Sequence, residues 1–201
     1  MRLPAATFKY LIYISAWGEE TSPRIAVYDT IEKTWKHAFY PLDEPQSQNG
    51  GWVGLSDISS LGGGKFLVLE RDNQGGPDAA LKKIYSIDLG DYDSWEDGVV
   101  LTKTLFKDLI KSGDLTSTNG QLIEKIEGLA VTANGDVWIN TDNDGVDDNS
   151  GESLLTEVGT YSESEMESSS GATNELFDKS SMLLMTVVLC LAPFVATIAS
   201  F

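Results

Sequence analysis

The stretch LGGGKFLVLERDN, residues 61–73, decides the fold. It places KFLVLE, a run rich in strand-favouring residues at 65–70, directly behind three glycines at 62–64. Glycines followed by such a run are typical of a strand entered through a tight turn. A second run of this kind, KIYSIDL at 83–89, follows along the chain. The stretch therefore predicts short strands joined by turns.

The same pattern continues in both directions from this stretch. Near the amino end, the apolar stretch MRLPAATFKYLIYIS is interrupted by Lys9, so it is a poor secretory signal, and the alternation of Tyr10, Ile12 and Ile14 predicts a first strand. Further short strands are predicted at residues 24–29, 34–40, 55–61, 99–106, 126–132 and 136–140. No helical period interrupts them, so the sequence predicts an all-β fold.

Two predicted hairpins resemble one another. Residues 54–73 and 128–143 each begin with Gly-Leu, pass through a glycine turn and end a second strand beside an Asp-Asn pair. Repeated sheets of this kind suggest a β-propeller, which closes with about four to eight blades. The chain has room for two to three, so we expect a partial, incomplete propeller-like domain.

Composition excludes several classes of protein. The chain has 201 residues, with 14 Lys and Arg against 31 Asp and Glu, and its net charge is −17. Nucleic-acid binding is excluded because it requires clustered basic residues. The single cysteine, Cys190, excludes an internal disulfide framework and a cysteine-rich zinc site.

Three segments differ in composition. Residues 1–156 are predicted to form the β domain, and residues 157–181 form a disordered linker rich in Ser and Glu. Residues 182–201 are apolar and uncharged, long enough to span a bilayer. Small residues and a polar spacer precede them, which is the order of a lipid-anchor (GPI) signal, and a retained transmembrane helix is the alternative. Either reading predicts a membrane protein, on the cell surface if the amino end is truncated.

Several strings together carry a resemblance to a known family. They are GLSDI at 54–58, KFLVLERDN at 65–73, KKIYSIDL at 82–89, TKTL at 102–105, EKIEGLAV at 124–131 and DNDG at 142–145. Across residues 40–155 the chain resembles the phytase-like family, also described as "esterase-like activity of phytase". The resemblance implies a propeller-like fold of about twice this length, matched only in its C-terminal half. It also implies phosphoester or ester hydrolysis on a phosphorylated small molecule.

Histidine-based chemistry is disfavoured by the residues themselves. His37 is the only histidine, and no G-x-S-x-G elbow presents a serine. No Arg-His-Gly motif for a phosphohistidine intermediate occurs either. The chemistry that remains is that of carboxylates and metal ions.

An acidic run follows the last predicted hairpin. Asn140, Asp142, Asp144 and Asp147 supply oxygen ligands near the turn-forming Gly145, and hard Ca²⁺ prefers such ligands. The run departs from an EF-hand because its glutamate comes one residue late and a strand precedes it. A Ca²⁺ loop of another design is therefore predicted, and a solvated Asp/Asn turn is the alternative.

A second polar group combines an arginine with carboxylates. Glu70, Arg71 and Asp72 end one predicted strand, and Glu127 begins another. In a propeller these strand ends meet, so Arg71 could hold phosphate while the carboxylates bind metal or move protons. The alternative is a structural ion pair between neighbouring sheets.

The tryptophans are predicted to pack in the core and its turns. They are Trp17, Trp35, Trp52, Trp95 and Trp138.

Two functions follow from the whole sequence. One is a membrane-anchored, metal-assisted phosphoester hydrolase, and the other is a non-catalytic binding module whose calcium loop is structural.

Overall fold

The computed structural model describes residues 10–15, 22–90, 94–115, 123, 125–142 and 153–162. Within these ranges every regular element is a strand except one short 3₁₀ turn. The elements, in chain order, are β1 (Tyr10–Ser15), β2 (Arg24–Asp29), β3 (Thr34–Phe39), β4 (Val53–Gly62), β5 (Lys65–Asp72), η1 (Gly76–Asp78), β6 (Lys82–Asp88), β7 (Val99–Val100), β8 (Lys103–Asp108), β9 (Ile126–Val131), β10 (Asp136–Thr141) and β11 (Leu155–Thr160). The all-β prediction is confirmed.

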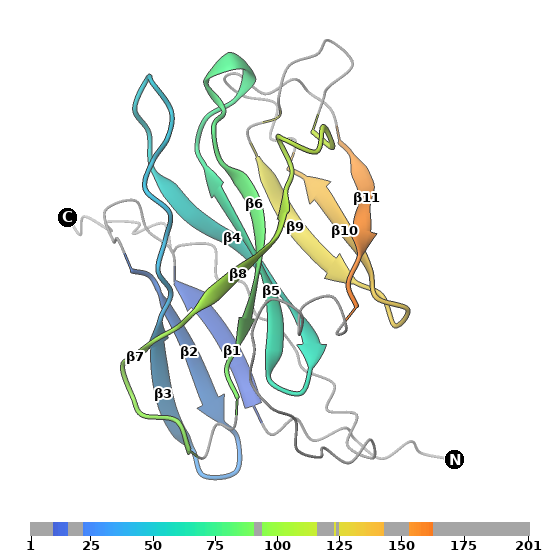
Figure 1. Ribbon diagram of the computed structural model, residues 1–201. Helices are drawn as coiled ribbons and strands as arrows, with labels where there is room; N and C mark the ends of the chain where they lie inside the picture. Colours follow the sequence, from blue (N-terminus) through green and yellow to red (C-terminus); the bar gives the residue numbers. More distant parts are fainter. Residues whose placement is uncertain are drawn as a thin grey trace, which may run out of the picture.

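The strands form three sheets (Figure 1). The first has the order β1-β2-β3-β7, the second β4-β5-β6-β8 and the third β11-β10-β9. All neighbouring strands are antiparallel except β3 and β7. The described strands do not close into a barrel.

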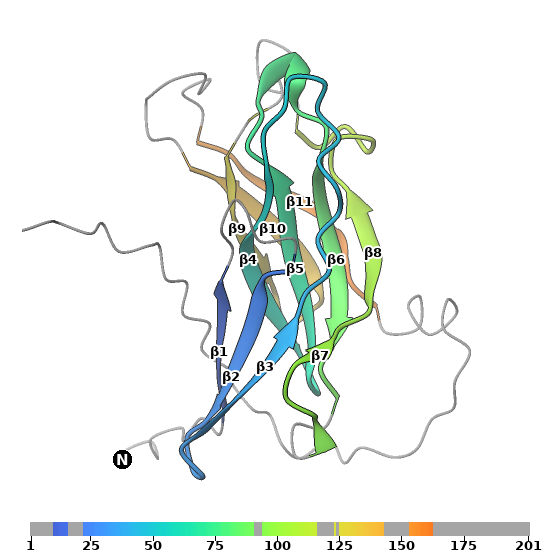
Figure 2. The same cartoon turned by 90° about the vertical axis from the view of Figure 1, so that its left-hand side faces the viewer.

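The second sheet lies between the other two, and its strands β5 and β6 contribute buried side chains to both cores (Figures 1 and 2). Successive side chains of a strand point to opposite faces. On β5, Phe66 and Val68 therefore pack toward the first sheet, while Leu67 and Leu69 pack toward the third. Burial on both faces explains why FLVL is a continuous apolar run and not an alternating one.

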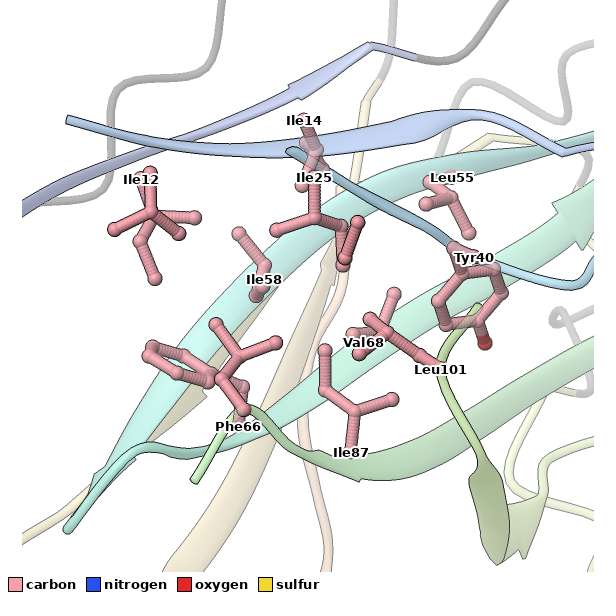
Figure 3. Close-up of a cluster of buried hydrophobic side chains, with 13 residues drawn as sticks. Ile12, Ile14, Ile25, Tyr40, Leu55, Ile58, Phe66, Val68, Ile87 and Leu101 are labelled. Carbon is pink, nitrogen blue, oxygen red and sulfur yellow. The ribbon is translucent and has the colours of Figure 1, made fainter. Parts of the chain in front are cut away.

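The core between the first and second sheets is mainly aliphatic, and it includes the rings of Tyr40 and Phe66 (Figure 3). Ile12, Ile14 and Ile25 come from the first sheet and face Val68 and Ile87 of the second. Each of these side chains is buried, and burying such a side chain stabilises the fold by roughly 1.5–3 kcal/mol. This core fixes the first sheet on one face of β4, β5 and β6.

The core between the second and third sheets is independent of the first. Leu69 and Ile84 of the second sheet face Leu129, Val137 and Ile139 of the third.

At the hairpin between β4 and β5, Gly63 and Gly64 both have positive φ, which confirms the predicted glycine turn.

The predicted strand at 99–106 is divided in two. Residues Val99–Val100 pair with β3 in the first sheet, whereas Lys103–Asp108 pair with β6 in the second. Between them Leu101 N donates to Phe39 O at 2.9 Å, and the chain changes sheets. The sequence alone predicts one continuous strand here, because both halves are rich in residues that favour strands.

The boundary between the β domain and the linker differs from the one expected. Strand β11 runs past residue 156, where the sequence predicted a linker, because Val158 is buried in the second core. The rest of that linker and the apolar segment 182–201 lie outside the described residues. In the ranges that are described, no helix is long and apolar enough to cross a membrane.

Candidate functional site

Strand ends from the second and third sheets meet at one end of the molecule, the upper end in Figure 1. The antiparallel registers pair Val53 with Asp72, Arg71 with Lys82, and Ile126 with Thr141. The starts of β4, β6 and β9 therefore lie beside the ends of β5 and β10. This arrangement brings Arg71 of the second sheet to Glu127 of the third.

Arg71 is held by several partners at this end. Its Nε donates to Ser56 Oγ at 2.9 Å, and one terminal nitrogen donates to Asp72 O at 3.2 Å. The other terminal nitrogen pairs with Glu127 Oε1. The guanidinium also lies 5.7 Å from the centre of the Trp52 ring. The predicted contact between Arg71 and Glu127 is present, and it joins two sheets.

A second carboxylate links the same sheets. Asp57 Oδ2 accepts a hydrogen bond from Leu129 N at 2.7 Å. Burial raises the pKa of Asp57, and the negative charge of Glu127 adds to that rise, although the Leu129 and Ile58 N–H groups oppose it. Asp57 is thus a structural neighbour of the Arg71–Glu127 pair that sequence analysis missed.

Glu70 lies on the opposite face of β5 from Arg71. It is fully buried, and its Oε2 accepts from Tyr40 Oη at 2.8 Å and from Lys103 Nζ at 2.7 Å. Its Oε1 accepts from Asp43 N at 2.6 Å. Burial raises the pKa of Glu70 more than Lys103 and the Asp43 N–H group lower it.

The carboxylate of Asp72 has a third set of partners, and Asp72 contacts Arg71 through its backbone carbonyl. Its carboxylate accepts from Ala80 N at 2.8 Å, from Leu81 N at 2.9 Å and from Lys82 Nζ at 2.7 Å. Lys82 also donates to Gln74 O at 2.8 Å and is fully buried. The contacts close the connection between β5 and β6, so they support the strand ends.

The side chains of the four residues predicted as catalytic are therefore divided among three sets of partners. Arg71 and Glu127 meet, whereas Glu70 and Asp72 each bind a different lysine. Asp43, Lys82 and Lys103 were not among the residues predicted from the sequence. Two features of the sequence could have indicated the lysines. Lys82 and Lys83 begin β6, and Lys103 begins β8, so each of these strands starts with a cation that can pair with the acidic end of β5.

The predicted calcium ligands begin at this same end. Asn140 and Asp142 are exposed, and Asp142 N donates to Lys125 O at 3.0 Å. Asp144 and Asp147 lie outside the described residues. Among the residues that are described, no group of three or more His, Cys, Asp and Glu could hold a metal ion.

His37 and the tryptophans complete the comparison with the sequence. His37 Nδ1 lies 3.2 Å from Asp97 Oδ1 on the first sheet, away from Arg71. Of the tryptophans predicted to pack in the core and its turns, Trp95 packs against the first core, whereas Trp35 and Trp52 are 52% and 39% exposed and belong to neither core cluster. Trp17 lies outside the described residues.

The fold and this polar end define an all-β domain of stacked antiparallel sheets whose strand ends carry an arginine–carboxylate site. The sequence profile of the family described as "Phytase-like: Esterase-like activity of phytase" matches residues 7–145. The chain belongs to the phytase-like family.

The extent of this match corrects part of the sequence prediction. It begins at residue 7, so it includes the first sheet and is not confined to residues 40–155 or to a C-terminal half. No curated protein and no solved structure matched the chain.

Proposed function

We propose that this domain hydrolyses phosphoesters with the help of Ca²⁺, at the strand ends around Arg71. The observation that carries the proposal is the position of the Arg71 guanidinium, fixed by Ser56 and Glu127 where the acidic segment after β10 begins. A guanidinium held in this way suits a phosphate group, because its planar donors match phosphate oxygens. The family description, which names phytase, supports the same chemistry.

The proposal gives the predicted residues different roles. Arg71 holds the phosphate, and Glu127 orients Arg71 and is placed to exchange a proton with bound water. Glu70 and Asp72 fix the end of β5 through Lys103 and Lys82, and so they position Arg71 without touching the substrate.

Calcium would be held by Asn140, Asp142, Asp144 and Asp147. The donor set fits, since an exposed amide and an exposed carboxylate at the end of β10 are the oxygen ligands that hard Ca²⁺ prefers. Bound Ca²⁺ would neutralise phosphate charge. This matters in a chain of net charge −17, which otherwise repels anions.

The three sheets are, in this proposal, consecutive blades of a propeller. Their stacking supports it, because β4 packs against both β1 and β9, so the first strands of successive sheets are neighbours. Active sites of propellers lie near the ends of such strands. We include in the proposal a membrane anchor at residues 182–201, supported by their uncharged, apolar composition.

A non-catalytic binding module is the second candidate. The observation that favours it is the engagement of Glu70, Asp72 and Glu127 in ion pairs with Lys103, Lys82 and Arg71. Carboxylates fixed in this way stiffen the fold. In this alternative the calcium loop is structural as well.

Phosphate release from inositol hexakisphosphate and from a phosphomonoester, with and without Ca²⁺, tests the proposal on the full chain. We expect Ca²⁺-dependent release that is lost in Arg71→Ala and in the double variant of Asp142→Ala and Asp144→Ala. Lys111→Ala, a change at an exposed lysine, is the control and should retain activity. A folded, monomeric preparation that releases no phosphate favours the binding module.

A further inference from the structure

Three donors of the second sheet converge on a single carboxylate. Asp43 Oδ2 lies 2.6 Å from Lys83 Nζ and 2.7 Å from Tyr85 Oη. Asp43 Oδ1 lies 2.7 Å from Lys103 Nζ. Hydrogen bonds between charged partners are roughly twice as strong as neutral ones. We refer to Lys83, Tyr85 and Lys103 as the carboxylate receptor.

The receptor is held in place by groups other than Asp43. Lys83 and Tyr85 lie two residues apart on β6 and share a face, and Lys103 lies on the adjacent strand β8. Lys103 Nζ also contacts Glu70 at 2.7 Å and lies 4.1 Å from the centre of the Tyr85 ring. The donors are thus ordered by the sheet, and Asp43 is the ligand that fills them.

Asp43, unlike the three donors, lies on an irregular connection and not on a strand. It lies on residues 40–52, which connect β3 to β4 with no strand or helix, and most of the side chains from 44 to 52 are exposed. The connection is attached by the bond from Asp43 N to Glu70, by Asn49 Nδ2 to Asp78 at 2.5 Å, and by Trp52 N to Asn73 at 2.8 Å. Exposed irregular segments of this kind open at a lower free-energy cost than the core.

We propose that the carboxylate receptor is a binding site for the carboxylate group of a small molecule, filled by Asp43 in this structure and exposed when residues 43–52 lift away. The site is separate from the proposed phosphate site, because Glu70 and Arg71 point to opposite faces of β5. With Glu70 ionised, the receptor without Asp43 has one excess positive charge, from two lysines and one glutamate. That balance favours a singly charged carboxylate over a phosphate dianion.

Acetate is the probe, and the full chain with Asp43→Ala is the test variant. We expect its Tm to fall below that of the wild type, and to rise in a saturable way with acetate but not with chloride at equal ionic strength. Glu44→Ala removes the adjacent exposed carboxylate and should give no acetate response. Adding Lys83→Met to Asp43→Ala removes one donor and should abolish the response.

Two results would overturn the proposal. One is a folded Asp43→Ala whose Tm responds equally to acetate and chloride; if that variant does not fold, Asp43→Ser is measured in the same way and decides the question. The other concerns the wild type, in which amide hydrogen exchange of residues 44–52 should accelerate in acetate but not in chloride. If the exchange rate of residues 44–52 is the same with and without acetate, a ligand does not displace Asp43 from the carboxylate receptor.

Discussion

Glu70 and Arg71 are adjacent in the chain, and their side chains leave opposite faces of β5. Glu70 bonds Tyr40 and Lys103 on the face toward the first sheet. Arg71 pairs with Glu127 of the third sheet. Two neighbouring residues thus connect the second sheet to the parts of the chain on each side of it.

Replacement of Lys103 by methionine should destabilise the fold strongly. Lys103 is shared by Glu70 and Asp43, and its loss leaves the fully buried Glu70 without its cation. Breaking a buried ion pair costs roughly 3–5 kcal/mol. Urea unfolding measures the change, with the exposed Lys111→Met as the control. Adding Glu70→Gln should recover part of the loss; a double variant as unstable as the sum of the two single variants would contradict this explanation.

The unfolding free energy should depend on pH through Asp43. Burial opposes its ionisation, but bonds from Lys103, Lys83 and Tyr85 outweigh burial and lower its pKa from 3.8 to about 2. The unfolded chain therefore binds the proton first as pH falls. Asp43 contributes about 1–2 kcal/mol above pH ~4, and this contribution disappears between about pH 4 and pH 2.

The measurement compares the wild type with Asp43→Asn across that range. Burial raises the pKa values of Glu70 and Asp57, so their contributions change with pH in the opposite direction. Subtracting the curve of the variant removes both. A difference between the two proteins that stays constant from pH 6 to pH 2 would show that Asp43 is not held as a carboxylate.

The positions of the strands could be predicted from the sequence, whereas the partners of the buried charged side chains could not. Strand positions follow from local alternation and glycine turns, so β5 and its hairpin were predictable from residues 61–73. Partners of buried charges follow from register and from how sheets stack. Residues as distant as Asp43 and Lys103 carry no local signal of their contact, and the division between β7 and β8 likewise depends on pairing with β3.

The candidate site was predictable only where two strand ends face each other. Arg71 and Glu127 were expected to meet because both flank equivalent hairpins, and they do. Glu70 and Asp72 were grouped with them because they are adjacent in sequence. Successive side chains of a strand point to opposite faces, so these neighbours are separated. Glu70 pairs with Lys103 and Asp72 with Lys82, and the sequence pattern identified neither lysine.

Gly64→Ala should destabilise the fold more than Gly63→Ala. Both glycines have positive φ in the same turn, where alanine costs roughly 1 kcal/mol. A Cβ at Gly64 would lie only 2.8 Å from Gly90 O, whereas a Cβ at Gly63 meets nothing within 4 Å. Because Gly90 O is a backbone atom, the hairpin must move, which adds about 1–3 kcal/mol. Thermal unfolding of the two variants measures the difference, and equal losses would contradict it.

The Arg71–Glu127 pair allows structural and catalytic roles to be separated. Glu127→Gln should lower the unfolding free energy by about 1 kcal/mol, because a neutral hydrogen bond to the buried guanidinium replaces a charged one. Arg71→Met should cost at least as much, and the double variant less than the sum, since the two side chains contact each other. Glu157→Gln, at an exposed carboxylate of β11, is the control. Phosphate release from the same variants then decides between the functions: activity lost in Glu127→Gln well below its melting temperature supports catalysis, whereas activity that falls only with the folded fraction assigns the pair to joining the two sheets.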